Sequence, residues 1–397
     1  MVLTQCAACA TELGLSLGKK CGRCSTRYCG PECQVQHWKE GGHDKLCKKI
    51  KKAGGAEQFR ANQKCTEAVA VAAEACAEDT KGQTCYICTQ ALHWKTKEGL
   101  VRGCSCRGTA GFAHVSCLAE EAKILREEAE ENNLDWKAKD ARWERWVRCG
   151  LCEQQYHGVV ACALGWACWK TYSGRPEADQ VRGMAMSVLG NGLSEADNDE
   201  DALTVQEAKL SMMRRLGASE ADLLRVQNNL AAAYFALGRS EQALQLKRDV
   251  YSGRVDMLGE EHEETLRAAN NYANSLVDLE RFEEAKALLR RTIPVTRRVL
   301  GDSSRTTLAQ RCNYAESLYE DPEATLDDLR EAVTTLEEVE RIARRVLGGA
   351  HPLTVDIEGE LRESRAALRA REASESGVVD VTSIREALEA MPPGDAN

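Results

Sequence analysis

The placement of cysteine constrains this chain more than any other feature. Nineteen cysteines occur among 397 residues, and all of them except Cys312 lie within the first 168 residues. They arrive in closely spaced pairs with histidines among them, and the chain opens without a charged-then-apolar signal segment. Thiolates and imidazoles are preferred zinc ligands, whereas disulfides are rare in reducing compartments. The sequence therefore predicts zinc binding in the cytoplasm or nucleus.

The first cluster of soft ligands occupies the first 47 residues. Eight paired ligands suit two closed tetrahedral sites with four ligands each. So short a segment cannot bury an adequate hydrophobic core, so metal binding must supply the free energy of folding. We expect a zinc-binding domain over residues 1–52 with these ligands: Cys6, Cys9, Cys21, Cys24, Cys29, Cys33, His43 and Cys47.

This segment resembles the MYND zinc finger. The resemblance rests on Tyr28-Cys29, Cys33-Gln34, Trp38 and the spacing of His43 and Cys47. The interleaved topology of that family implies two ligand groups, Cys6, Cys9, Cys29 and Cys33, and Cys21, Cys24, His43 and Cys47. The family also implies a shallow groove for proline-rich peptides, to which Gln34 and Trp38 contribute. Alternatively, Trp38 only packs into the small core.

A second cluster of eight ligands follows, and it again suits two zinc ions, so that four ions are expected in the chain. Its members are Cys85, Cys88, Cys104, Cys106, His114, Cys117, Cys149 and Cys152. The spacing, together with Ile87, Arg107-Gly108-Thr109, Phe112 and Cys117-Leu118, resembles the RING-CH (RING-variant) finger, expected over residues 85–158. A PHD finger has the same ligand order but usually an aromatic residue where this chain has Val147.

The RING-CH resemblance implies a cross-braced pairing and a mode of action. One ion takes Cys85, Cys88, His114 and Cys117, and the other takes Cys104, Cys106, Cys149 and Cys152. RING-type fingers have no catalytic nucleophile and act by docking a ubiquitin-conjugating enzyme, which is catalysis by positioning. The family places its apolar docking contacts at Ile87 and Leu151, and one of Trp136, Trp143 and Trp146 could complete that surface. Two departures are the 31 residues from Leu118 to Arg148 and the acidic Glu153 at a position that is often basic.

The second half of the chain repeats. Leu216-Gly217, Leu258-Gly259 and Leu300-Gly301 step by 42 residues, and an insertion near Pro322 lengthens the next step to 47. Each period divides into two helical stretches at a turn. Because such a hairpin cannot bury its apolar face alone, neighbouring hairpins must stack into a solenoid. We expect this solenoid over residues 159–371.

The repeats resemble tetratricopeptide repeats of the kinesin light chain type. The residues that carry the resemblance are Asn228 to Ala231 with Tyr234, Gly238 and Ala243, and Asn270 to Ala273 with Ala285. In that family the first helix of each hairpin lines a concave groove for extended peptides, which would place Asn229, Asn271 and Asn313 in a ladder along it. Alternatively, these asparagines only satisfy neighbouring helices.

Three other segments complete the predicted organisation. Residues 53–84 are alanine-rich and are expected to form a helical linker, and residues 372–397 are polar and are expected to be a disordered tail. The apolar run from Val159 to Trp169 has eleven residues, whereas a spanning helix needs about 20, so we expect a buried helix and no transmembrane segment. The predicted fold class is mainly α, with two small cross-braced zinc-binding domains followed by a tetratricopeptide-like solenoid.

The basic run Lys48, Lys49, Lys51 and Lys52 is what remains unexplained. Residues 1–52 carry ten Lys and Arg against four acids, a balance of +6. Such a run could contact nucleic acid or a nuclear import receptor, but the overall pI of about 5.5 makes nucleic acid an unlikely partner. A solvated domain edge is the simpler interpretation.

Two functional hypotheses follow. The first is a RING-CH-type ubiquitin ligase that docks a ubiquitin-conjugating enzyme and recruits substrate through its MYND and tetratricopeptide modules. The second is a non-enzymatic interaction scaffold in which all three modules bind proteins. A lysine methyltransferase is excluded because its Asn-His-x-Cys motif and glycine-rich cofactor strand are missing. Cysteine-protease chemistry at Cys117 and His114 is disfavoured because both are better explained as metal ligands.

Overall fold

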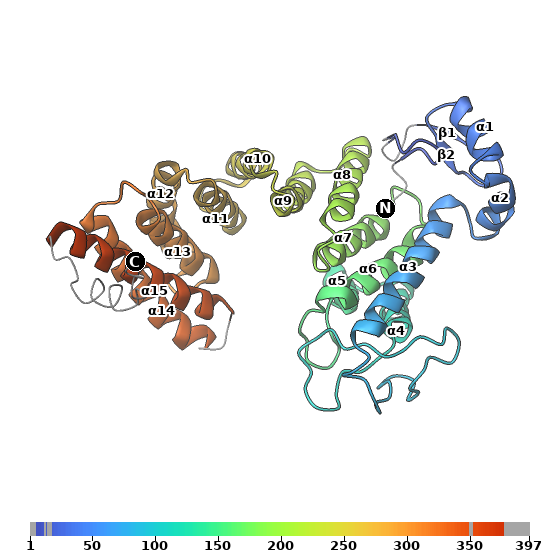
Figure 1. The fold of residues 1–397 in the computed structure, drawn as a ribbon, viewed down its shortest axis with the longest axis horizontal. Coiled ribbons are helices and arrows are strands. Elements are labelled where there is room, and N and C mark those ends of the chain that lie inside the picture. Colours follow the sequence, from blue (N-terminus) through green and yellow to red (C-terminus); the bar gives the residue numbers. More distant parts are fainter. Residues whose placement is uncertain (1–4, 12, 14–17, 349–351, 377–397) are drawn as a thin grey trace, which may run out of the picture. The chain divides into compact units, whose positions relative to one another are not determined.

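The computed structural model describes residues 5–11, 13, 18–348 and 352–376. These residues form a mainly α-helical fold divided into two compact units, residues 1–239 and residues 240–397 (Figure 1).

The first zinc-finger segment is built from a short hairpin and two helices. Strands β1 (Lys19–Lys20) and β2 (Arg27–Tyr28) pair antiparallel, and helices α1 (Pro31–Lys39) and α2 (His43–Lys52) follow. Pro31 stands in the first turn of α1, where its missing N–H leaves no hydrogen bond unmade. The small core of this segment combines metal-ligand cysteines with a few apolar side chains, among them Tyr28, Ile50 and Ala56.

Helix α3 (Ala56–Ala75) lies in the predicted linker and packs against α6 (Gly158–Tyr172). A two-glycine turn precedes it, in which Gly54 has φ +98° and Gly55 has φ +114°, values that a residue with a Cβ rarely adopts. The buried face of α3 is made of small residues such as Ala61, Cys65 and Ala72. Because these side chains are short, the two helices can approach closely.

The second zinc-finger segment consists of loops around one longer helix and two short helical elements. These are α4 (Val115–Glu131), α5 (Trp136–Trp143) and the 3₁₀ helix η1 (Glu144–Trp146). The Asp135 carboxylate accepts the Ala138 N–H at 2.7 Å and so caps α5. Isolated bridges between Val101 and Ala113 and between Arg148 and Gln155 close the loops that carry the ligand pairs.

One hydrophobic core joins this segment to the helices around it. Trp146, Trp169, Tyr172, Leu164 and Met186 are among its largest fully buried side chains. The apolar run predicted to be a buried helix lies in α6, whose side chains are buried on nearly all sides. Within the described part of the chain, no helix combines the length and hydropathy that a membrane span requires.

Three further helices complete the first unit. They are α7 (Gln180–Ser194), α8 (Asp199–Arg215) and α9 (Glu220–Ala236), and each packs against the helix before it. Asp179 accepts the Val181 N–H at 2.8 Å and so starts α7, while Ser219 caps α9 in the same way.

The second unit is a run of antiparallel helices. They are α10 (Ser240–Leu258), α11 (Glu263–Asp278), α12 (Phe282–Leu300), α13 (Arg305–Tyr319), α14 (Leu326–Leu347) and α15 (Pro352–Ser376). Ala243, Ala285 and Ala332 recur at the repeat spacing, and all three are fully buried where successive helices meet. In the predicted insertion, Asp321 forms an ion pair with Lys286 at 2.8 Å.

The end of the chain departs from its predicted boundary. The tail was expected to begin at residue 372, but α15 continues to Ser376. The rest of the predicted tail, residues 377–397, lies outside the described residues.

Candidate metal centres

Four groups of cysteine and histidine side chains converge in the first unit. Within each group, one ligand atom from every residue lies within 4.8 Å of the others. The groups are Cys6, Cys9, Cys29 and Cys33; Cys21, Cys24, His43 and Cys47; Cys85, Cys88, His114 and Cys117; and Cys104, Cys106, Cys149 and Cys152. Each group holds the four residues that the interleaved pairing assigns to one ion.

The spacing of the ligand atoms fits a tetrahedral zinc ion. Zinc–sulfur bonds of about 2.3 Å put two sulfurs about 3.8 Å apart on the edge of a tetrahedron. In the first group the Sγ atoms of Cys9, Cys29 and Cys33 are separated by 3.3 to 3.6 Å. In the fourth group Cys106 Sγ lies 3.7 Å from Cys149 Sγ. All-sulfur and sulfur-rich sets of this kind are the donors of structural zinc sites.

The second group takes two ligands from α2. His43 and Cys47 lie four residues apart on one face of this helix, and both are fully buried. His43 Nε2 lies 3.4 Å from Cys24 Sγ, and Cys47 Sγ lies 4.0 Å from Cys21 Sγ. The other ring nitrogen of His43 is buried among the aromatic rings of Tyr28, His37 and Trp38. His37 is outside the group, and its Nδ1 lies 3.0 Å from the Tyr28 hydroxyl.

The third group uses the opposite ring nitrogen of its histidine. His114 Nδ1 lies 3.3 Å from Cys88 Sγ and 3.6 Å from Cys117 Sγ. Its Nε2 lies 3.4 Å from the Ala91 carbonyl, which can accept the remaining ring proton and hold the ring in orientation. His114 is the N-cap residue of α4, and Cys117 belongs to its first turn.

Four of the ligand pairs share one local fold, which we call the knuckle. In each Cys-x-x-Cys pair, the residue after the second cysteine has a positive φ of about 60°, and its N–H donates to the carbonyl of the first cysteine. The residues in that position are Ala10, Ser25, Thr89 and Glu153. The first cysteine's N–H donates to the carbonyl five residues later in all four knuckles, at 2.7 to 3.0 Å. The spacing of two residues therefore closes a loop that points both sulfurs at one centre.

The knuckles of the second finger also determine how the predicted docking residues are oriented. The N–H groups of Ile87 and Leu151 each lie 3.4 Å from the sulfur of the cysteine two residues before them, Cys85 and Cys149. With the backbone turned toward the sulfur, the side chains point outward, and Ile87 is 39% and Leu151 53% exposed. Of the three tryptophans, only Trp136 is exposed, at 79%, because Trp143 and Trp146 lie in the core.

Sequence reasoning missed Tyr86 beside this surface. Its side chain is partly exposed, and its hydroxyl donates to the Glu121 carboxylate of α4 at 3.5 Å. Burial of part of the ring and the Glu121 charge raise the pKa of Tyr86, so the phenol stays protonated at neutral pH. An aromatic residue between Cys85 and Ile87 was the signal that could have drawn attention to it.

The predicted peptide contacts of the first finger lie on α1. Trp38 is 41% exposed. Its ring packs in a T-shaped arrangement against the His43 ring, and the two ring centroids lie 5.6 Å apart. Gln34 is half-buried. The neighbouring Val35, which the sequence did not single out, exposes its side chain on the same helix.

The predicted asparagine ladder belongs to both units. Asn229 on α9 and Asn271 on α11 are half-buried, whereas Asn313 on α13 is buried. The Asn313 amide lies 3.3 Å from the Asn270 side-chain oxygen and 3.5 Å from its carbonyl, so it can donate to either. This contact agrees with the alternative in which the asparagine satisfies a neighbouring helix.

The cysteines left over from the four groups are mostly buried thiols. Burial raises the pKa of Cys65 and Cys168, and it raises that of Cys162 to about 11. Cys312 is buried in the second unit, and its pKa is also raised by burial. Such thiols are protonated and unreactive at neutral pH.

Comparisons with known proteins give the following matches. The family model for the MYND finger matches residues 6–47, that for the RING-variant domain matches residues 85–133, and that for the tetratricopeptide repeat matches residues 223–264 and 265–305. The last ligand pair, Cys149 and Cys152, lies beyond the RING-variant match, although the structure brings it to Cys104 and Cys106. No curated protein matches the sequence.

Two solved structures are similar to this chain at low sequence identity. The crystal structure of BtubC (BKLC) from P. vanneervenii is 15% identical, with a TM-score of 0.42, covering 71% of this chain and 94% of that one. A putative kinesin light chain of Podosopora anserina with nearly identical TPR-like repeats is 19% identical, with a TM-score of 0.39, covering 58% of this chain and 97% of that one. By the three family models that match it, the chain carries a MYND finger, a RING-variant domain and tetratricopeptide repeats.

Proposed function

We propose that the RING-variant domain docks a ubiquitin-conjugating enzyme and that the protein acts as a ubiquitin ligase. The observation that carries this proposal is the exposure of Ile87 and Leu151 at the tips of two knuckles. An isolated exposed apolar residue needs no explanation, but here two stand at equivalent positions of one zinc-built frame. Tyr86 and Trp136 add exposed apolar surface in the same domain.

In this reaction the ligase acts by positioning the reactants and supplies no reacting group. The reacting thioester belongs to the conjugating enzyme, so the ligase accelerates transfer by holding that enzyme and its ubiquitin in a reactive geometry. Zinc ions held by these ligands would fix the shape of the loops that carry Ile87 and Leu151. The Ile87 and Leu151 N–H groups donate to the sulfurs of Cys85 and Cys149, which holds the docking residues in place before any partner binds.

Substrate recruitment is assigned to the other modules. Trp38 and Gln34 on α1 would contact peptides at the MYND finger, and Asn229 and Asn271 would contact extended peptides along the repeats. Asn313 would contribute less to peptide binding, because its amide nitrogen already donates to Asn270. Partners of both modules are therefore proteins or peptides, and a cytoplasmic or nuclear location stays a prediction.

A scaffold without ligase activity is the second candidate. It is favoured by Glu153, whose side chain is exposed directly after the last ligand. An acidic residue there would repel a carboxylate on the conjugating enzyme or on ubiquitin, where a basic residue would attract it. Under this alternative the RING-variant domain only binds proteins.

An autoubiquitination assay on the full chain tests the proposal. The variants are Ile87→Ala with Leu151→Ala, Glu153→Arg, and the matched control Val71→Ala, which removes an equally exposed apolar side chain from α3. With a panel of conjugating enzymes, we expect product to fall at least about tenfold in the double variant and to rise with Glu153→Arg.

The outcomes separate the two candidates. Product that is equally reduced by Val71→Ala, or unaffected by the double variant, would contradict docking through the knuckles. If neither the native chain nor Glu153→Arg gives product while four zinc ions remain bound per chain, the ligase proposal is wrong and the scaffold without ligase activity is favoured.

A further inference from the structure

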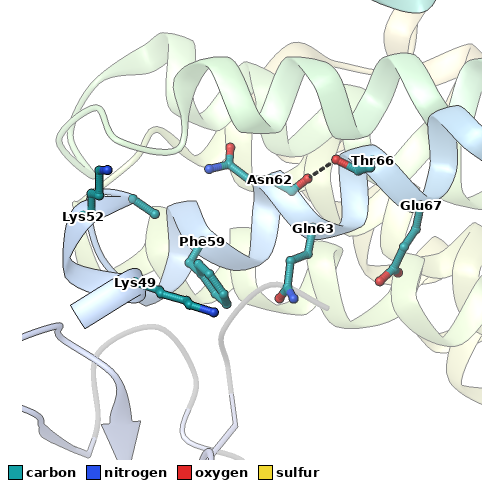
Figure 2. Close-up of a pocket in the computed structure, with 8 residues that line it drawn as sticks. Lys49, Lys52, Phe59, Asn62, Gln63, Thr66 and Glu67 are labelled. Atoms are coloured by element: carbon teal, nitrogen blue, oxygen red, sulfur yellow. Dashed lines mark hydrogen bonds between the residues drawn. The ribbon is translucent and has the colours of Figure 1, made fainter. Parts of the chain in front are cut away.

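A cavity of about 590 Å³ lies where α2 ends and α3 begins, just after the MYND match at residues 6–47, and neither Gln34 nor Trp38 lines it. It is lined by side chains of both helices and of Ala53 in the turn between them; the lining residues are Lys49, Lys52, Ala53, Phe59, Asn62, Gln63, Thr66 and Glu67. Figure 2 shows Lys49, Phe59 and Gln63 directed to the same side of the helices. We call this cavity the α2–α3 pocket.

The second metal centre fixes the walls of this pocket. The Ala56 N–H, at the start of α3, donates to the carbonyl of the metal ligand Cys24 at 3.1 Å. The Gly55 N–H donates to the Ile50 carbonyl at 3.0 Å, so the turn between the helices is also tied to α2. Phe59 packs against the small core that holds the metal ligands. The pocket is therefore preformed, which lowers the entropic cost of binding a ligand.

The charge of the pocket is positive at one end. In the part of the chain that the structure describes, the ammonium groups of Lys49 and Lys52 have no carboxylate partner, whereas Lys64 and Glu67 form an ion pair at 3.3 Å near the other end. Between the two ends, the Phe59 ring and Ala53 give an apolar wall, and Asn62 and Gln63 provide amides. This order favours a ligand with negative charge at one end and an apolar group beside it.

We propose that the α2–α3 pocket binds an acidic peptide segment that carries a large apolar side chain. Its carboxylates pair with Lys49 and Lys52, its apolar side chain packs on Phe59, and the Gln63 amide hydrogen-bonds its backbone. The Lys64–Glu67 pair leaves the far end without net positive charge, so the acidic residues are directed to the Lys49 and Lys52 end. This assignment gives a role to half of the lysine run, and it does not depend on ubiquitin transfer.

The lysine run itself provides a matched control. Lys48, Lys49, Lys51 and Lys52 belong to one helix and are all exposed, but only Lys49 and Lys52 line the pocket. Replacing Lys49 and Lys52 by glutamate changes the net charge by the same amount as replacing Lys48 and Lys51 by glutamate. A partner that senses only the positive helix, such as nucleic acid, responds equally to both changes.

The experiment measures fluorescence anisotropy with the full-length, zinc-loaded protein. The probe is a fluorescein-labelled peptide with three glutamates followed by tryptophan, with glutamine-for-glutamate and alanine-for-tryptophan versions as controls. We expect Lys49→Glu with Lys52→Glu to weaken binding of the acidic peptide by roughly tenfold or more, and Lys48→Glu with Lys51→Glu to weaken it by roughly threefold or less. Both peptide controls should bind more weakly than the probe, and Phe59→Leu should reduce the effect of the tryptophan. Zinc content checks that each variant is folded.

Three results would overturn the proposal. The first is that the native protein does not bind the peptide. The second is that the two lysine-pair variants lose the same amount of peptide affinity. The third is that a single-stranded oligonucleotide binds more tightly than the peptide and depends equally on all four lysines.

Discussion

The Glu153 N–H donates to the Cys149 carbonyl at 3.0 Å, and this hydrogen bond holds Glu153 in the left-handed region with φ +57°. Ala10, Ser25 and Thr89 adopt the same conformation at the corresponding position of the other three knuckles. Residues with a Cβ lose roughly 1–2 kcal/mol in this region. The two fingers have different sequences around their ligands, yet each accepts this cost to close its knuckles.

Glycine at position 153 should stabilise the second finger. Glycine removes the left-handed penalty of roughly 1–2 kcal/mol but loses roughly 0.5–1 kcal/mol more chain entropy on folding. We therefore expect Glu153→Gly to raise the free energy of unfolding by about 0.5 kcal/mol. Gln154→Gly is the control: that position has no positive φ, so glycine brings the entropic loss and removes the weak side-chain hydrogen bond to the Cys152 carbonyl, with no strain to relieve. Urea unfolding in excess zinc measures both, and a destabilised Glu153→Gly variant would contradict the strain argument.

Metal removal should unfold the fingers and spare the repeats. Because the first finger has little core besides its ligands, chelation should abolish its structure, while the second unit keeps its helices. Replacing one ligand, as in Cys47→Ser, should lower zinc from four ions per chain toward three. Cys162→Ser, which changes a buried cysteine outside the four groups, should leave four. A colorimetric zinc assay and far-UV circular dichroism read these outcomes, and loss of most helical signal on chelation would contradict the expectation.

The pair Glu57 and Arg182 should stabilise the first unit more than its surface ion pairs do. The Arg182 guanidinium is buried, donates to both Glu57 carboxylate oxygens at 2.9 and 3.0 Å, and lies 5.0 Å from the centre of the Trp169 ring. Arg182→Met should cost roughly 2–4 kcal/mol, because the carboxylate loses its partner and the Ser173 carbonyl loses a donor. The double variant with Glu57→Leu should recover part of that loss. A double-mutant cycle by urea unfolding tests this, and strictly additive losses would show that the pair is not coupled.

Two carboxyl groups should make the second unit less stable as pH rises. Burial, with neighbouring carboxylates, raises the pKa of Glu316 to about 7 and that of Glu360 to about 8, from a usual value of 4.5. The folded chain therefore keeps protons that the unfolded chain has released, so the free energy of unfolding falls between about pH 5 and about pH 8. At pH 8, Glu360→Gln should be more stable than the native chain by roughly 2 kcal/mol, and at pH 5 the two should converge.

Local measurement keeps this effect apart from the metal centres, which themselves depend on pH. Amide hydrogen exchange in α13 and α15 should slow in Glu360→Gln at pH 8, after correction for the intrinsic exchange rate. The control is Glu372→Gln, which changes an exposed carboxylate near the end of the same helix, where it pairs with Arg330. Equal protection in the native chain and Glu360→Gln at pH 8 would contradict the raised pKa.

Short-range patterns made most of the architecture predictable. Pairs such as Cys85 and Cys88 are local, so their spacing alone indicates a metal knuckle, and the repeated Leu-Gly steps indicate the helical hairpins. The partner of a helix is not encoded locally. Residues 53–84 were predicted as a linker, but the small residues on α3 bury against α6, about one hundred residues further along the chain. Likewise, the sequence offers Trp136, Trp143 and Trp146 equally, and only the three-dimensional core separates the exposed one from the buried two.

Helix α3 also sets the distance between the first and the second finger. It begins in the small core of the first finger, where Ala56 is buried, and it ends in the shared core that surrounds the second finger, where Ala72 is buried. Twenty helical residues span about 30 Å, and a helix packed along its length behaves as a stiff rod. A peptide held at the first finger and an enzyme held at the second would therefore meet at a separation and a rotation that the chain fixes in advance. Adding one full turn to this rod would move the two apart by about 5.4 Å while nearly preserving their relative orientation.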